Sequence, residues 1–155
     1  MSTKTKSNAP RDPDYERRVR ASFEGQPAMS RLFGARMVAL SPGETEIHIP
    51  LRPDFLQQTG NVHGGIVGAL ADSAAGYAAL SLLDAQLEVV TVEYKINFVA
   101  PAYGELLIGR GRVVRAGRTL QVCVAEIFAV KDGIETLCAY MTTTMMAVPD
   151  SKHKP

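Results

Sequence analysis

The spacing of hydrophobic and polar positions changes along the chain. Apolar residues first recur at helical spacing from Tyr15 to Phe23, and residues 28–33 could add a further helical turn. Residues 36–40 and 45–51 then flank a Ser-Pro-Gly-Glu turn, and apolar and polar positions alternate in the second of these segments. The pattern predicts a short packing helix followed by a hairpin with one buried face.

The middle of the chain predicts a long helix, running from residue 64 to about residue 83. It is rich in Ala and Gly, and Asp72 is its only charged residue. We expect the small side chains to let a sheet approach the helix backbone closely. An unpaired carboxylate in an apolar interior costs several kcal/mol, so Asp72 requires a partner or water.

The second half of the chain has the composition of β-strands. Four runs rich in Val, Ile, Thr, Tyr and Phe are separated by turn-forming residues, at 89–99, 105–115, 119–130 and 134–148. They predict an antiparallel meander. The expected fold class is α+β, with a curved antiparallel sheet wrapped around one long central helix.

Composition and charge restrict the class of protein. With 46% hydrophobic residues and a formal net charge of +1, the chain fits one globular domain, expected at 14–150, after a disordered polar tail at 1–13. The charge gives no general reason to bind nucleic acid or an anionic membrane. No signal peptide or membrane span is indicated, so we expect a cytoplasmic protein. Cys123 and Cys138 lack metal-ligand spacing and are expected to be buried free thiols.

The segment His63-Gly64-Gly65 leads directly into the central helix. Backbone N–H groups in the first turn of a helix lack an intrahelical acceptor, and the helix dipole adds partial positive charge there. The amides of Gly64 and Gly65 could therefore hold an oxyanion. The alternative is that the two glycines only form a tight entry to the helix.

Asp72 lies eight residues after Gly64, or about 12 Å along a helix axis. One chain therefore cannot place both groups on the same carbonyl group. Two such helices packed antiparallel across a twofold axis would bring the start of one beside the middle of the other, which favours a homodimer. The alternative for Asp72 is a structural carboxylate bonded to a neighbouring backbone or hydroxyl group.

Three segments resemble a known family: residues 57–65 (Gln-Gln-Thr-Gly-Asn-Val-His-Gly-Gly), 71–73 (Ala-Asp-Ser) and 91–102, which contains Phe-Val-Ala-Pro. Together they are similar to the hotdog-fold acyl-CoA thioesterases of the phenylacetate-degradation (PaaI-like) type, and the resemblance extends over residues 32–148. It implies a hotdog fold, an acyl-CoA substrate and no metal or separate cofactor. It also implies a homodimer or a tetramer, with active sites formed between subunits.

The resemblance implies a role for each matching residue. Asp72 would act as nucleophile or as general base for water, and the Gly64 amide would bind the oxyanion. Gln57 would position the thioester carbonyl or water, and His63 would be an orienting hydrogen-bond donor. Thr91 would hold the acid or the water. Strict alternation, however, places Thr91 on the polar face of its strand, so a bulge or an interface on that face of the sheet is needed.

The resemblance further implies contacts with coenzyme A, whose phosphates require local basic groups. The turn at 115–119 contains two arginines but would otherwise be a solvated hairpin tip. The expected substrate-binding residues are Asn61, Gly65, Val99, Ala100, Pro101, Arg115, Gly117, Arg118 and Thr119.

Two other functions are compatible with the same residues. One is a non-catalytic module that binds acyl-CoA, and the other is a lyase or dehydratase acting on 3-hydroxyacyl chains through His63 and Asp72. The acyl chain itself depends on which aromatic and aliphatic side chains line the pocket, the candidates being Phe55, Leu56, Tyr77, Tyr94 and Phe98.

Overall fold

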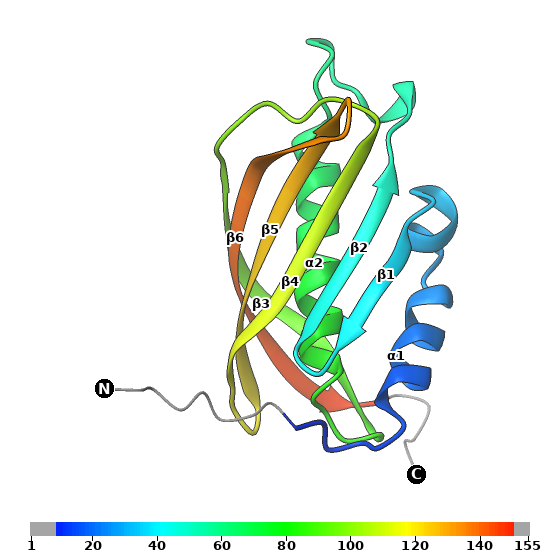
Figure 1. Ribbon diagram of the computed structural model, residues 1–155. Helices are drawn as coiled ribbons and strands as arrows, with labels where there is room; N and C mark the ends of the chain where they lie inside the picture. The colour runs from blue at the N-terminus through cyan, green and yellow to red at the C-terminus, as the bar shows by residue number, and fades with distance from the viewer. Residues whose placement is uncertain (1–8, 151–155) are drawn as a thin grey trace.

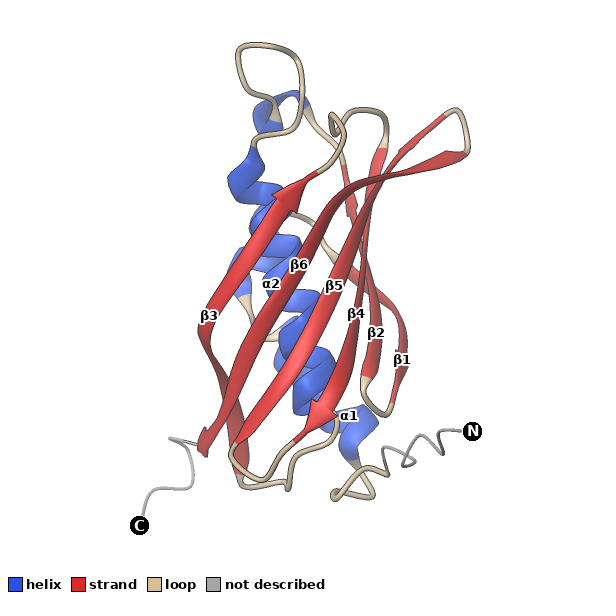
Figure 2. Ribbon diagram, turned by 90° about the vertical axis from the view of Figure 1, so that its left-hand side faces the viewer, coloured by secondary structure: helices blue, strands red, loops and turns tan. Residues whose placement is uncertain are grey.

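A six-stranded antiparallel sheet wraps around one long helix in the computed structural model, which describes residues 9–150. The long helix lies on the concave face of the sheet (Figures 1 and 2). The helical elements are α1 (Tyr15–Glu24), η1 (Ala28–Leu32), η2 (Pro53–Phe55) and α2 (Gly64–Leu80). The strands are β1 (Arg36–Ser41), β2 (Glu44–Pro50), β3 (Leu87–Phe98), β4 (Leu106–Ala116), β5 (Leu120–Lys131) and β6 (Ile134–Pro149). The predicted α+β fold is confirmed.

The order of the strands corrects the predicted meander. The strands follow one another across the sheet as β1-β2-β4-β5-β6-β3, so only β4, β5 and β6 form a meander. Strand β3 does not pair with β4. After α2 the chain passes to the edge of the sheet opposite β1. There β3 pairs with β6 and forms the edge strand (Figure 2).

Glycines on β4 let the sheet approach α2 closely. A Cβ atom on Gly111 would lie 2.2 Å from the carbonyl oxygen of Ala74, and one on Gly109 would lie 2.7 Å from Cγ of Leu70. The Thr45 hydroxyl on β2 also donates a hydrogen bond of 2.7 Å to the Ala74 carbonyl. The predicted close approach is present, and glycines of the sheet contribute to it as well as the small residues of α2.

Helix α1 packs beside α2, and the ordered segment begins before it. Val19 and Phe23 are buried, and the Phe23 ring meets the Tyr77 ring edge-on with centroids 5.3 Å apart. Asp12, which we expected in the disordered tail, is buried and accepts a hydrogen bond of 2.7 Å from Arg18. The tail prediction is therefore wrong for residues 9–13, and residues 1–8 lie outside the described part.

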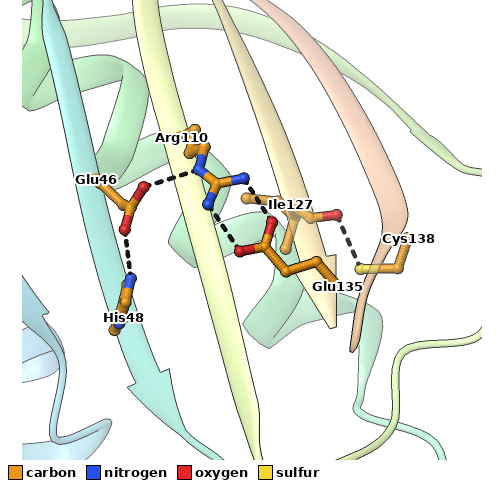
Figure 3. Close-up of polar contacts among 6 residues, drawn as sticks. All are labelled: Glu46, His48, Arg110, Ile127, Glu135 and Cys138. Atoms are coloured by element: carbon orange, nitrogen blue, oxygen red, sulfur yellow. Dashed lines mark hydrogen bonds and ion pairs between the residues drawn. The ribbon is translucent and has the colours of Figure 1, made fainter. Parts of the chain in front are cut away.

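A network of charged side chains ties three strands together on the outer face of the sheet. Figure 3 shows Arg110 between Glu46 and Glu135, with His48 on the other oxygen of Glu46. Arg110 binds Glu135 through two hydrogen bonds of 2.7 and 2.9 Å, and these contacts hold the pKa of Glu135 below its usual range. Each member of the network has a charged or polar partner within it, so we infer that the network helps to fix the register of the strands.

Both cysteines are buried free thiols, as predicted. Burial raises the pKa of Cys123 to about 12 and that of Cys138 to about 11. The Cys138 thiol donates to the Ile127 carbonyl at 3.2 Å, a contact also drawn in Figure 3. Neutral, buried thiols are poor nucleophiles. None of the helices within residues 9–150 is long and apolar enough to cross a membrane.

Candidate active site

Asp72 lies near the middle of α2, where it is half-buried. The Thr91 hydroxyl on β3 donates a hydrogen bond of 2.7 Å to Oδ1 of Asp72. Behind this pair lies Met145 of β6, which is fully buried and whose sulfur is 3.5 Å from the Thr91 hydroxyl. The carboxylate thus has one fixed polar partner on the sheet.

A bulge in β3 brings Thr91 to this position. Thr91 pairs with Met145 of β6, whereas Glu93 pairs with Thr144, so Val92 is the extra residue on β3. Such an insertion reverses which side chains face the helix. Thr91 therefore faces α2 although strict alternation places it with the polar side chains of the strand.

The start of α2 has one engaged and one free amide. His63 is the N-cap residue, and its Nδ1 accepts a hydrogen bond of 3.0 Å from the Gly65 N–H. At this atom the His63 ring accepts a hydrogen bond, whereas we expected it to donate one. Because the Gly65 N–H is engaged by His63, it is no longer a candidate oxyanion donor. Within residues 9–150 the Gly64 N–H meets no acceptor, so it remains available at the positive end of the helix.

A cleft of about 520 Å³ lies beside this free amide. Gly64 lines the cleft together with Gln57 and Asn61 of the preceding loop, and with residues 99–101 after β3. The Phe98 ring covers Gly64 closely, since a Cβ atom built on Gly64 would lie 3.1 Å from Cζ of Phe98. The structure thus brings together six of the residues predicted from the sequence: Gln57, Asn61, Gly64, Val99, Ala100 and Pro101.

Asp72 and Thr91 line a different cleft, of about 870 Å³, which is bounded by α1, α2 and the start of β3. The two clefts share no lining residue. Asp72 follows Gly64 by eight positions, which separates the two groups by about 12 Å along the axis of α2. Each chain therefore carries a carboxylate with a hydroxyl partner in one cleft, and an amide donor with polar side chains in another.

The turn between β4 and β5, which holds Arg115, Gly117, Arg118 and Thr119, lines neither cleft. In the sheet, Leu120 is level with Met146 of β6, whereas Phe98 is level with Ala139. Seven residues of strand separate these levels, which is about 23 Å. Within one chain, the turn and the segment 99–101 thus lie toward opposite ends of the strands.

Sequence reasoning missed the part of the Asp72 cleft formed by α1. Ser22 of this helix and Gln26, just after its end, line the cleft, and Gln26 accepts a hydrogen bond of 3.2 Å from the Tyr77 hydroxyl. Burial raises the pKa of Tyr77 to about 12, so the hydroxyl stays protonated. Gly76 also lines the cleft, and its place one turn after Asp72 was the available signal. In the described part of the chain, no three His, Cys, Asp or Glu side chains cluster as metal ligands would.

A helix wrapped by an antiparallel sheet, with a single acid at the helix centre, defines a protein of the hotdog fold. The chain matches the thioesterase superfamily over residues 59–136, and it belongs to this family. A solved thioesterase family protein of Silicibacter pomeroyi is 45% identical, with a TM-score of 0.85 and coverage of 88% of this chain and 99% of the other.

Two further relatives support the same family. A solved phenylacetic acid degradation-related protein of Ralstonia eutropha is 29% identical, with a TM-score of 0.73 over 85% of this chain and 98% of the other. A candidate esterase of Saccharolobus solfataricus is 34% identical over 68% of this chain and 73% of its own length.

Proposed function

We propose that the protein hydrolyses acyl-CoA thioesters to a free acid and coenzyme A, at sites formed between two copies of the chain. The observation that carries the proposal is the Asp72 carboxylate, which Thr91 holds at 2.7 Å while it borders an open cleft. Asp72 acts there as general base for water or as nucleophile, and Gly64 of the partner subunit donates to the oxyanion.

The separation of the two clefts supports the dimer. Among the described residues, Gly64 does not line the Asp72 cleft, and no Asp or Glu lines the Gly64 cleft. An antiparallel pair of α2 helices joins the two halves and creates two equivalent sites. The edge strand β3 is consistent with such a pairing, because its Val92 and Phe98 are 53% and 56% exposed and an open apolar edge is usually covered.

In the base-assisted reaction, Asp72 takes a proton from water while the water oxygen bonds to the thioester carbon. The carbonyl oxygen becomes an oxyanion and accepts a hydrogen bond from the Gly64 amide. The carbon–sulfur bond then breaks, and the proton passes to the leaving thiolate. Loss of one oxyanion donor typically costs a hundredfold to a thousandfold in rate. Gln57 lines the Gly64 cleft and supplies an amide that aligns the carbonyl.

The coenzyme A portion is assigned to the Gly64 cleft and the segment 99–101. In a twofold pair, the Arg115–Thr119 turn that serves this cleft belongs to the partner or to a further copy in a tetramer, because the turn of the same chain lies at the other end of the sheet. Its arginines would meet the phosphates.

Release of free thiol from a panel of aryl, short, medium and long acyl-CoAs tests the activity. Asp72→Asn keeps the shape of the side chain and is expected to lower kcat by about a hundredfold to ten-thousandfold. Hydrolysis that persists undiminished in Asp72→Asn contradicts the mechanism. Tight binding without thiol release would instead favour the non-catalytic module.

Mixing two inactive variants tests the shared site. When Asp72→Asn and Gln57→Ala chains exchange subunits, half of the dimers are mixed, and each mixed dimer has one intact site if the site is shared. About a quarter of the wild-type activity should return. No recovery, in dimers shown by mass to have exchanged, would place Gln57 and Asp72 of the same chain in one site.

A further inference from the structure

The cleft beside Asp72 continues along α2 toward the C-terminal end of that helix. Gly76, Tyr77 and Leu80 line it on the α2 side, and Val89 lines it on the β3 side. Leu80 follows Asp72 by eight residues, or about 12 Å along the helix axis. The cleft therefore has room for an extended group that begins at the carboxylate and lies along α2.

Gly76 stands beside the carboxylate in this part of the cleft. A Cβ atom built on Gly76 would lie 3.8 Å from the methyl carbon of Met145, which is an ordinary contact. Met145 also contacts the Thr91 hydroxyl. A side chain at position 76 would thus enter the cleft next to the Asp72–Thr91 pair, and the glycine keeps this passage open.

The side of the cleft near Gly76 is held rigidly. The Tyr77 hydroxyl is bonded to Gln26 at 3.2 Å, and the Tyr77 ring packs edge-on against Phe23 of α1. Tyr77 is almost fully buried by these contacts. An aromatic wall held by α1 and by Gln26 just after it gives the cleft a defined width rather than an adaptable one.

An ion pair closes the far end. Arg18 donates to Asp12 at 2.7 Å and to the Leu83 carbonyl at 2.9 Å, so the pair is fixed against the end of α2. An apolar chain that reached this pair would meet charged side chains to which it offers no polar contact, which is unfavourable. An extended chain spans about 1.2 Å per bond, so the 12 Å from Asp72 to Leu80 correspond to about ten bonds.

We propose that this part of the cleft binds the acyl group, and that Gly76 sets the acyl length by leaving the passage past Asp72 open. The preferred substrates are acyl-CoAs whose acyl group extends up to about ten bonds from the thioester. This inference rests on the proposed function, because it assigns the acyl end of the substrate to the Asp72 cleft.

The test is the dependence of kcat/KM on acyl length, from acetyl-CoA to hexadecanoyl-CoA. In the wild type, each buried methylene should raise kcat/KM by up to about fourfold, until the chain reaches roughly ten bonds and the value falls. Gly76→Leu should lower kcat/KM for decanoyl-CoA by about a hundredfold, and that for acetyl-CoA by less than about threefold. Acetyl-CoA is thus the internal control for folding.

Two milder variants keep the test decisive if Gly76→Leu does not fold. Gly76→Ala adds one carbon at an ordinary contact distance and should shift the preferred length downward by a smaller amount. Ala85→Leu, in the connection after α2, should lower kcat/KM only for the longest chains. An equal loss at every length in the Gly76 variants, or an unchanged length profile, would overturn the inference.

Binding of non-hydrolysable thioether analogues separates this inference from the proposed function. If the wild type releases no thiol from any acyl-CoA, the proposed hydrolysis is wrong. The length rule is still tested, because Gly76→Leu should weaken binding of the decyl analogue and spare that of the ethyl analogue. Equal affinity of the wild type and Gly76→Leu for both analogues would overturn the inference.

Discussion

The Thr91 hydroxyl donates a 2.7 Å hydrogen bond to the Asp72 carboxylate, and a bulge at Val92 makes this contact possible. The strand thereby turns a hydroxyl toward a helix that it would otherwise face with an apolar side chain. The bond fixes one carboxylate oxygen and leaves the other for water or substrate. Thr91 therefore positions the carboxylate on which the proposed chemistry depends.

Thr91→Val removes the hydroxyl while keeping a branched side chain of similar size. A hydrogen bond to a charged group contributes about 1.5–3 kcal/mol, so kcat for acyl-CoA hydrolysis should fall by about tenfold to a hundredfold. Thr91→Ser retains the hydroxyl and should keep most of the wild-type kcat. Thiol release measured at saturating substrate decides the matter, and an unaffected kcat in Thr91→Val would exclude this role.

His63 stabilises the start of α2 through its Nδ1 atom, which accepts from the Gly65 N–H at 3.0 Å. His63→Ala should lower the free energy of unfolding by about 1 kcal/mol, because one first-turn amide loses its acceptor. Asn is among the preferred N-cap residues, so His63→Asn should restore most of the loss. Urea unfolding of the three proteins measures the difference, and equal stabilities of Ala and Asn variants would argue against capping.

Local sequence patterns were sufficient for much of the fold. The small-residue helix, the first hairpin and the β4–β5–β6 meander follow from hydrophobic spacing and turn residues, which act over a few neighbours. The place of β3 at the far edge could not be predicted in this way, because it depends on which edge of the sheet the chain joins after α2. Asp12 was assigned to the tail for a similar reason: its burial depends on Arg18 and on the end of α2.

The site was predictable only in part. Gln57, Gly64 and Asp72 stood out through motif and spacing, and the structure places Gln57 and Gly64 in the same cleft. The bulge that turns Thr91 inward leaves no mark in the alternation of residues. Gln26, which supports the wall of the Asp72 cleft, follows a helix whose sequence predicts packing alone.

Asp12 gives the stability of the protein a defined dependence on acid. The hydrogen bond from Arg18 holds the pKa of Asp12 below its usual range, and the Asp14 amide lowers it further. A carboxylate with a depressed pKa in the folded state contributes stability above the unfolded value, near pH 4, and this is lost as the pH falls through the folded value.

The free energy of unfolding should therefore decrease on acidification from about pH 5 to about pH 2, and decrease less steeply in Asp12→Asn. Arg18→Gln removes the main cause of the lowered pKa and should also reduce the slope. Urea unfolding at a series of pH values measures both slopes. Slopes equal to that of the wild type in both variants would show that this pair contributes nothing to acid sensitivity.

Gly68 lies midway between Gly64 and Asp72 on α2. If Gly64 of one chain faces Asp72 of its partner, the two copies of residue 68 must meet near the twofold axis. A Cβ atom on Gly68 would have no neighbour within 4 Å in its own chain, so a larger residue is tolerated in the monomer. Gly68→Lys places two positive charges against each other at that axis and should give folded monomers without hydrolytic activity.

Light scattering after size exclusion, with far-ultraviolet circular dichroism as the test of folding, measures the effect of this substitution. Ser41→Lys adds the same charge at the exposed end of β1, so it should leave both the mass and the activity unchanged. A Gly68→Lys protein that keeps the mass and activity of the wild type would mean that the α2 helices do not cross at this residue. The shared site would then require another arrangement of the two chains.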